Sequence, residues 1–381
     1  MPPSFKPKKT FFPFTLSLNG LIGISVLTLN TLGLIILASA SQSFSHNAIP
    51  YFQKQVTWLA LACLFLALAY KTPWEKLRSY TWIFGGCSVF LLLLVLIPGV
   101  GIKVNGAQRW LNLKVIRLQV SEFAKVGLTL VLAHYLASNQ RHIHTFKKGF
   151  LWPACITGLF SCLIIVEPDF GTAFLCGLVG FSLMFLAGTR LIYLIPCIAS
   201  GLFAFAIAVL LNPVRLKRIT AFLDLEGNKS EGAYQLWQGI IAFGSGGLQG
   251  LGLGNGRQQL SFLPEAHTDF IFPIIGEELG LIFTLFIVIL FFIIFFVGAL
   301  NIPKVPHMYS FILAAGSMLF IVFQALINIG VVTGLLPTKG MCLPFISYGG
   351  TNIMVMLIFV GILMHCLKKW KLAPLKEGRD L

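Results

Sequence analysis

The sequence predicts an all-α, polytopic membrane protein with about ten transmembrane helices and a large extracytoplasmic loop between helices 7 and 8. Three observations lead to this fold class. The 381 residues are 57% hydrophobic and only 11% charged, their mean hydropathy is +0.86, and their apolar runs are too long for a water-soluble core. No soluble domain separates from the rest, so we interpret residues 1–381 as one integral membrane domain.

Hydropathy places the candidate crossings in order along the chain. They are residues 15–41, 56–70, 80–97, 119–136, 150–166, 172–188, 191–211, 270–300, 308–333 and 346–366. The first follows three lysines and ends near Ala38-Ser39-Ala40, which imitates a secretory signal. Its apolar stretch is long enough to cross a bilayer, so we interpret it as an uncleaved helix.

The distribution of lysine and arginine predicts the orientation, because cytoplasmic loops carry the excess of these residues. Residues 1–14 and 367–381 are then cytoplasmic tails, and 212–269 is the large extracytoplasmic loop. The cations placed inside are Lys6, Lys8, Lys9, Lys71, Lys76, Arg78, Arg141, Lys147, Lys148, Lys368, Lys369 and Lys371.

The net charge of +15 is explained by cations facing anionic membrane lipid, and it does not predict nucleic-acid binding, because no basic soluble domain is present. The eight cysteines have no CxxC spacing, which argues against a disulfide framework or a zinc site.

Two outer segments, 98–118 and 212–269, carry charge against the positive-inside rule. Ten of the thirteen acids also fall on that side: Glu122, Glu167, Asp169, Asp224, Glu226, Glu231, Glu265, Asp269, Glu277 and Glu278. Glu122, Lys125, Glu277 and Glu278 lie at or within apolar spans, where an ionised group needs a partner or a wet cavity. We therefore favour a functional outer cavity over loops that are merely solvated.

The glycine-rich segment GSGGLQGLGLGNG, Gly244 to Gly256, has neither the dinucleotide nor the P-loop spacing. Glycine permits tight turns and close approach of the backbone, and the preceding Tyr234 to Phe243 is amphipathic. A packed, partly membrane-embedded loop is favoured over a flexible linker.

The stretch LPEAHTDFIFPIIGEELG, residues 263–280, places four carboxylates and a histidine in front of an apolar run. Asp269 is either a general base with a pKa raised by partial burial or a helix cap, and the spacing leaves both open. Glu277 and Glu278 need cationic partners, for which Lys125, Arg109 and Lys339 are candidates.

Glu122 and Lys125 are three residues apart and can reach each other on one helix face, as a structural ion pair or as catalytic groups. His267 could be a ligand, an acid or a structural residue, and the sequence leaves these roles open.

Six motifs together resemble the SEDS family (shape, elongation, division and sporulation proteins). They are GAQRWLNL (106–113), QVSEFAK (119–125), EPDFGT (167–172), LPEAHTDFIF (263–272), GEELG (276–280) and PTKGMCLPFISYGG (337–350). The resemblance covers nearly the whole chain and is greatest to the cell-division (FtsW) branch rather than the elongation (RodA) branch. The chain departs from the family pattern at Val120, Glu167, Phe170 and Arg257-Gln258, where the family usually has proline, glutamine, leucine and other residues.

The resemblance implies a peptidoglycan glycosyltransferase that polymerises lipid II at the outer face of the bacterial cytoplasmic membrane, and Asp269 as its catalytic base. The motifs further imply a substrate-binding set of Arg109, Trp110, Glu122, Lys125, Glu265, His267, Lys339 and Ser347. Arg109, Lys125 and Lys339 would balance the charge of the leaving undecaprenyl pyrophosphate.

The implied partners are lipid II, the undecaprenyl-linked glycan chain, a class B penicillin-binding transpeptidase, other division proteins and membrane lipid. No organic cofactor is expected, and a divalent cation, Mg²⁺ or Mn²⁺, held between carboxylates and pyrophosphate stays open.

Two other functions also stay open. One is a flippase for the lipid-linked precursor, for which Gln324 and Asn328 offer a deeper polar path, although a hydrogen bond between helices would also explain them. The other is a non-catalytic division scaffold.

Overall fold

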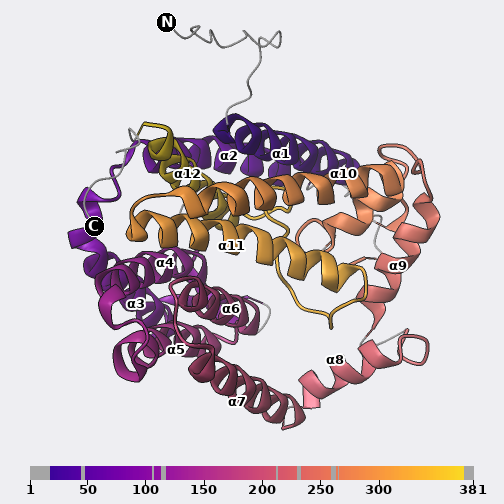
Figure 1. Ribbon diagram of the computed structural model, residues 1–381. Coiled ribbons are helices and arrows are strands. Elements are labelled where there is room, and N and C mark those ends of the chain that lie inside the picture. The colour runs from indigo at the N-terminus through magenta and orange to yellow at the C-terminus, as the bar shows by residue number, and fades with distance from the viewer. Residues whose placement is uncertain are drawn as a thin grey trace, which may run out of the picture.

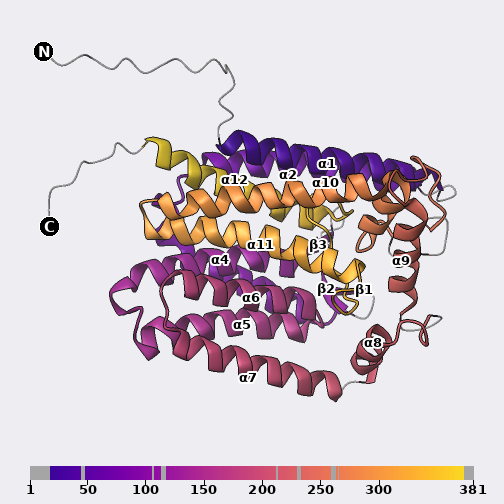
Figure 2. The ribbon, with the colours of Figure 1, turned by 45° about the vertical axis from the view of Figure 1, so that its right-hand side comes forward.

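The computed structural model describes residues 18–43, 48–104, 107–112, 117–211, 213–229, 233–258, 263–264 and 266–372. Long helices lie side by side in it, as the all-α prediction requires (Figures 1 and 2). The predicted crossings correspond to α1 (Leu18–Ser43), α2 (Ala48–Lys71), α3 (Thr81–Leu96), α4 (Val120–Ser138), α5 (Trp152–Val166), α6 (Phe170–Leu186), α7 (Leu191–Leu210), α10 (Ile271–Asn301), α11 (Met308–Val332) and α12 (Gly350–Leu372).

The described part of the chain has eight helical spans that are long and apolar enough to cross a membrane, while α6 and the part Leu191–Gly201 of α7 are shorter apolar helices. The protein is therefore a multi-pass membrane protein, and a total of ten crossings stays a prediction. All eight cysteines are free thiols.

The most buried helices form the centre of the bundle. In the most apolar stretch of each helix, 83% of the residues are buried in α11 and in α12 and 72% in α4. The corresponding shares are only 17% in α2 and 22% in α3. α11 packs against α4, α6, α10 and α12, and α12 also packs against α2. Side chains such as Leu64, Ile83 and Phe90 on the outer helices remain exposed, which is where lipid would lie.

A small antiparallel sheet between α3 and α4 is the element that the all-α prediction did not include. It consists of β1 (Gly101–Val104), β2 (Ala107–Asn112) and β3 (Arg117–Gln119), in the order β1-β2-β3. Trp110 pairs with Ile102 on one side and Gln119 on the other. The amide of Gln108 donates to the carbonyl oxygens of Val95 (3.1 Å) and Ile97 (3.3 Å), which fastens the sheet to the end of α3.

The sheet lies at the same end of the helices as α8 (Pro213–Leu223) and α9 (Tyr234–Gly246) (Figure 2). α9 contains the predicted amphipathic segment and packs against α10, with the Phe243 and Phe272 rings 5.8 Å apart. The loop predicted for 212–269 therefore contains two helices.

The glycine-rich loop packs against α10 where that helix is interrupted. Gly280 has φ +77° and ends the first part of α10, which leaves backbone groups without helical partners. The loop supplies them: Leu251 and Gly252 donate to the Glu277 and Glu278 carbonyls, each at 2.9 Å, and the Leu281 amide donates to the Gly247 carbonyl at 2.9 Å. The prediction of a packed loop is confirmed, and these hydrogen bonds allow a helix break among apolar surroundings.

Candidate active site

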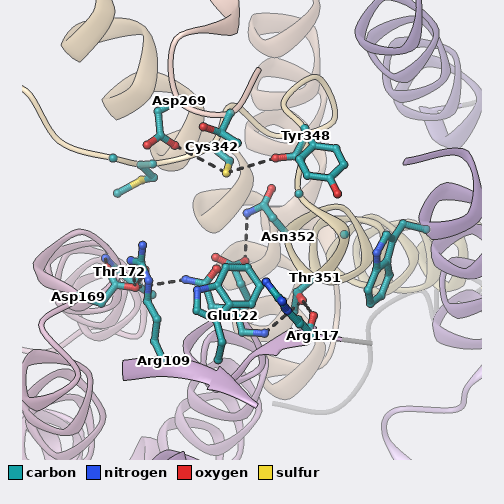
Figure 3. Close-up of a pocket in the computed structure, with 18 of the residues that line it drawn as sticks. Arg109, Arg117, Glu122, Asp169, Thr172, Asp269, Cys342, Tyr348, Thr351 and Asn352 are labelled. Carbon is teal, nitrogen blue, oxygen red and sulfur yellow. Dashed lines mark hydrogen bonds and ion pairs between the residues drawn. The ribbon is translucent and has the colours of Figure 1, made fainter. Parts of the chain in front are cut away.

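A cavity of about 600 Å³ opens at the end of the bundle that carries the sheet (Figure 3). Its walls come from α2, the sheet, the first turns of α4, α6 and α12, the segment before α10 and the connection between α11 and α12. The lining residues are Tyr51, Lys54, Trp58, Arg109, Trp110, Arg117, Gln119, Glu122, Asp169, Thr172, Thr268, Asp269, Gly340, Met341, Cys342, Tyr348, Gly349, Gly350, Thr351 and Asn352.

Asp269 lies on this wall, partly buried, two residues before α10 begins. The N-cap position of α10 is Phe270, so Asp269 does not occupy the capping position that the sequence left open. Its Oδ1 lies 3.8 Å from the Cys342 Sγ. Burial, followed by the charge of Asp269, raises the pKa of Cys342 well above its usual value, so the thiol stays protonated and can donate weakly.

The main chain beside Asp269 is held by Asn328 of α11. Its Nδ2 donates to the Asp269 carbonyl at 2.9 Å and to the Met341 carbonyl at 2.6 Å. One amide thus joins two cavity walls. Gln324, one turn earlier, donates to the Cys342 carbonyl at 2.9 Å. The two polar residues that suggested a deeper path through the membrane therefore bind the loops of the cavity.

Arg109 and Asp169 form an ion pair on the opposite side of the cavity from Asp269 (Figure 3), with Arg109 Nη1 3.1 Å from Asp169 Oδ2. Asp169 also caps α6, because its carboxylate accepts from the backbone N–H of Thr172 (3.2 Å) and from the Thr172 hydroxyl (3.0 Å). Burial alone would raise the pKa of Asp169, but Arg109 and the Thr172 hydrogen bonds outweigh it and lower the pKa.

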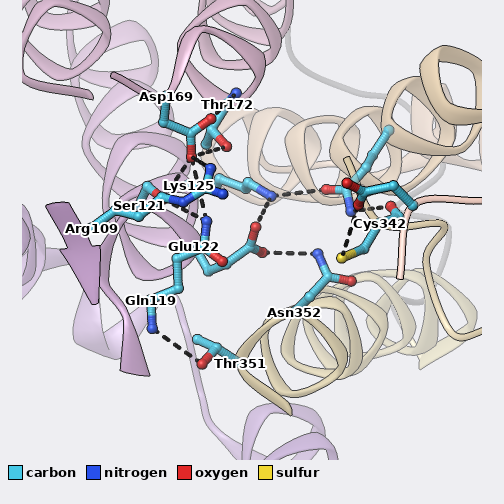
Figure 4. A network of polar contacts seen from close by, with 12 residues as sticks. Arg109, Gln119, Ser121, Glu122, Lys125, Asp169, Thr172, Cys342, Thr351 and Asn352 are labelled. Carbon is cyan, nitrogen blue, oxygen red and sulfur yellow. Dashed lines mark hydrogen bonds and ion pairs between the residues drawn. The ribbon is translucent and has the colours of Figure 1, made fainter. Parts of the chain in front are cut away.

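Glu122 and Lys125 form the predicted pair, with Lys125 Nζ 2.7 Å from Glu122 Oε1 (Figure 4). Lys125 also donates to Gln324 Oε1 at 2.8 Å, and Asn352 donates to the other Glu122 oxygen at 3.1 Å. Glu122 lines the cavity, whereas Lys125 is only 1% exposed and is not among the lining residues. Lys125 is therefore not placed to contact a ligand in the cavity directly.

Lys54 and Arg117 add positive charge to the cavity rim. Both side chains are exposed, and within the described residues neither forms an ion pair. The wall also carries Arg109, which is paired with Asp169, and Glu122, whose partner Lys125 does not line the cavity. Cations that form no ion pair within the protein are well suited to bind an anionic ligand.

The remaining predicted site residues differ in their position relative to the cavity. Trp110 lines the cavity. The ring of His267 lies against Tyr51 (5.3 Å) and Tyr348 (5.8 Å), which do line it. Ser347 is buried away from the cavity, where its hydroxyl accepts from the Leu343 amide at 2.8 Å, so the structure does not support direct contact with a ligand. Glu265 lies outside the described residues.

Lys339 lies close to the start of α6 but is not among the lining residues. Its Nζ donates to the Phe170 carbonyl at 2.8 Å and is 5.3 Å from the Phe174 ring centroid. Burial lowers the pKa of Lys339 to about 8, with Asp169 acting in the opposite direction.

The cations proposed as partners of Glu277 and Glu278 have other partners: Lys125 pairs with Glu122, Arg109 pairs with Asp169, and Lys339 donates to the Phe170 carbonyl. Glu277 accepts from the backbone amides of Arg257 (2.8 Å) and Gln258 (3.2 Å), and Glu278 accepts from Ser39 Oγ (2.8 Å) and the Gly254 amide (3.1 Å). These acids secure the glycine-rich loop and do not line the cavity. Because backbone N–H groups are the donors, the unusual residues Arg257-Gln258 do not disturb the arrangement.

Sequence reasoning did not select Lys54, Arg117, Asp169 or Asn352 as site residues. Asp169 could have been found, because Asp three residues before Thr at the start of an apolar run is a capping pattern. Arg117 also had a signal, since it stands outside against the positive-inside rule. Lys54 and Asn352 depend on the packing of α2 against α12, which no local pattern reveals.

A metal site is not preformed in the described part of the chain, where no three His, Cys, Asp or Glu side chains converge. Of the cavity carboxylates, Glu122 and Asp169 are already bound to cations. A divalent cation therefore stays a prediction, and most of its ligands would have to come from the substrate.

Comparison with known proteins places the chain in a family. A sequence model of the FtsW, RodA and SpoVE proteins, described as "Cell cycle protein", matches residues 20–371. The chain belongs to this family. The FtsW/RodA/SpoVE relatives include two proteins named "Probable peptidoglycan glycosyltransferase FtsW". The one from Coxiella burnetii is 40% identical, covering 90% of this chain and 94% of the relative, and the one from Legionella pneumophila is 39% identical, covering 93% and 91%.

Two solved structures share the FtsW/RodA/SpoVE fold. One, described as "Structural coordination of polymerization and crosslinking by a peptidoglycan synthase complex", has a TM-score of 0.75 at 25% identity and covers 92% of this chain and 97% of that one. The other is the rod shape determining protein RodA of Thermus thermophilus, with a TM-score of 0.68 at 25% identity and coverage of 91% and 96%. The all-α membrane fold and the family resemblance are thereby confirmed.

Proposed function

We propose that this protein is a peptidoglycan glycosyltransferase that polymerises lipid II during cell division. The observation that carries the proposal is the position of Asp269. It lies, partly buried, on the wall of a cavity of about 600 Å³, two residues before α10 begins and with its Oδ1 3.8 Å from the Cys342 thiol. Membership of the family and the names of the relatives support the same activity.

The reaction follows from this arrangement. Asp269 takes the proton of the acceptor GlcNAc 4-hydroxyl, and the oxygen attacks the anomeric carbon of the donor MurNAc from the side opposite the leaving group. The new C1–O4 bond forms as the C1–O bond to undecaprenyl pyrophosphate breaks, with inversion at C1. The leaving group departs with the bonding electron pair, and the proton remains on Asp269 until solvent removes it.

The cations of the cavity would bind the pyrophosphate. Arg109 reaches it from the sheet, while Lys54 and Arg117 approach from the rim. We assign Lys125 and Lys339 indirect roles, because Lys125 is engaged by Glu122 and Gln324, and Lys339 by the Phe170 carbonyl. Trp110, Tyr51 and Tyr348 supply aromatic surface for the sugars.

The proposal also covers the orientation of the protein in the membrane and its partner proteins. Both termini are cytoplasmic, the cavity faces the outside of the bacterial cytoplasmic membrane, and a class B penicillin-binding transpeptidase cross-links the product alongside other division proteins. The solved relative described as a peptidoglycan synthase complex supports an assembly of this kind. No organic cofactor enters the mechanism.

The test is polymerisation by the purified full-length protein. It is incubated in detergent with lipid II, with and without the transpeptidase, and the products are separated by length. We expect glycan strands that lengthen with time. A protein that makes no strands with its partner present, but moves lipid II across proteoliposome membranes, would instead be a flippase.

A further inference from the structure

Glu167 is a buried acid that the proposed mechanism does not use. It lies in the turn between α5 and α6, two residues before Asp169, and does not line the cavity. Its side chain is 0% exposed, and among the described residues neither carboxyl oxygen has a hydrogen-bond partner. An ionised carboxylate in such a place would lack the donors that normally compensate for lost water, so the geometry favours the protonated acid.

The charged groups around Glu167 belong to the Arg109–Asp169 pair. Asp169 and Arg109 both act on Glu167 through their charges, and Asp169 in turn faces Lys125 of α4 and Lys339 of the α11–α12 connection. Arg109 has a spare donor, because its Nη1 contacts Asp169 while its Nε is buried without a partner in the described part of the chain. A second carboxylate would therefore compete for Arg109.

We propose that Glu167 is a positioning residue that sets, through Arg109, how tightly the cavity holds the pyrophosphate of a lipid-linked substrate. The inference rests on the proposed function. When Glu167 is protonated, Arg109 faces one carboxylate and keeps positive charge for the ligand. When Glu167 is ionised, Arg109 faces two carboxylates, and the buried negative charge repels the pyrophosphate.

The direction of the pH dependence follows. Burial, and after it the charge of Asp169, raises the pKa of Glu167 to about 8, against the opposing effect of Arg109. Below this pH the acid is neutral and the pyrophosphate is held. Above it the acid loses its proton, so ligand binding must take a proton up again, and affinity falls by up to about tenfold per pH unit.

Any test must distinguish the pH effect of Lys339 from that of Glu167, because burial also lowers the pKa of Lys339 to about 8. It loses positive charge over the same range and would weaken anion binding in the same direction. Glu167→Gln keeps the shape but never ionises, whereas Lys339→Arg keeps its positive charge throughout.

The experiment measures binding of undecaprenyl pyrophosphate to the full-length protein in detergent on both sides of pH 8, for wild type, Glu167→Gln and Lys339→Arg. We expect affinity to fall above pH 8 in wild type and in Lys339→Arg, and to fall clearly less in Glu167→Gln, where only the loss of charge on Lys339 remains. A second readout, proton uptake when the ligand binds to Lys339→Arg protein above pH 8, does not depend on the folding of the glutamine variant.

Coinciding curves for wild type and Glu167→Gln would overturn the inference, as would the absence of proton uptake. Neither result would touch the proposed function, since lipid II polymerisation below pH 8 is measured separately. Failure of polymerisation with the pH-dependent difference intact would instead reject the enzyme and keep the role of Glu167 in pyrophosphate binding.

Discussion

Three carboxylates share the wall of the cavity, and their neighbours give them different chemistry. Glu122 is held by Lys125, and Asp169 by Arg109 and two donors of Thr172. A carboxylate fixed by cations is a poor base, because the charged form is already stabilised. Asp269 faces the weakly donating Cys342 thiol. Its place on the cavity wall, two residues before α10, supports its assignment as the base.

Asp269→Asn should reduce lipid II polymerisation by about 10²–10⁴-fold, because asparagine keeps the size of the side chain but cannot take a proton. Membrane insertion and binding of the transpeptidase should not change. The measurement is glycan synthesis by matched amounts of purified protein. Asp224→Asn is the control, since Asp224 is exposed and its carboxylate accepts a local hydrogen bond from the Gly227 amide. Equal activities of the two variants would remove Asp269 from the role of base.

Lys125→Met should lower stability by about 3–5 kcal/mol, because it leaves the buried Glu122 without its cation. The double variant Lys125→Met/Glu122→Gln should recover much of this loss, since the unpaired charge is gone. Thermal denaturation of both proteins in detergent measures the difference. A double variant as unstable as Lys125→Met would mean that Lys125 contributes mainly by packing.

The sequence predicted the types of charged residue in the site better than their contacts. Glu122 with Lys125 was predictable, because an i,i+3 spacing brings the two side chains together on any helix. The partners of Glu277 and Glu278 were not, because backbone amides belong to every residue and leave no mark in the sequence. Arg109 could be assigned to an anion, but its partner Asp169 is 60 positions away and is joined to it only by the fold.

At the scale of elements, the broken helix α10 and the glycine-rich loop form one unit. The loop can approach because Gly250, with φ +79°, lacks a Cβ that would lie 2.2 Å from the Glu278 carbonyl oxygen. The backbone hydrogen bonds to α10 and the two glutamates then hold the loop in place. The two parts of this unit flank Asp269 in sequence, with the loop before it and α10 beginning two residues after it.

Gly250→Ala should displace the loop and lower both stability and polymerisation, because the new methyl group clashes with backbone rather than with a flexible side chain. Gly244→Ala is the matched control. Gly244 lies within α9 with no atom near the added Cβ, and alanine there should leave stability equal or about 0.5–1 kcal/mol higher. Limited proteolysis of the loop reports the displacement. Two equally resistant variants would contradict the tight packing.

The helices were predictable because each crosses a membrane as one apolar run, and that signal is local. The sheet was not. Its strands are three to six residues long, and their hydrogen bonds come from neighbouring strands. Such short strands carry little periodicity, and the charged residues Lys103 and Arg109 indicated only an outer loop near the site, without indicating strands.

At the scale of the whole molecule, all the cavity-lining groups lie at one end of the bundle, which makes the orientation in the membrane decisive. The positive-inside rule places Lys229 outside and Arg141 inside, and both side chains are exposed. Lys229→Cys should therefore react with a membrane-impermeant thiol reagent on intact cells, and Arg141→Cys only after lysis, each above the background of the native cysteines. The reverse pattern would put the cavity on the cytoplasmic side.

Asn328 has a consequence for how the protein can be controlled. Its side-chain amide binds the segment before α10 and the connection before α12, and the Tyr348 amide joins the same two segments by donating to the His267 carbonyl at 2.9 Å, so a shift of one segment should move the other. The two walls of the cavity that carry Asp269 and Met341 are therefore mechanically coupled. A partner protein that displaced either of these segments would change the distance between the two walls of the cavity without contacting a reacting atom.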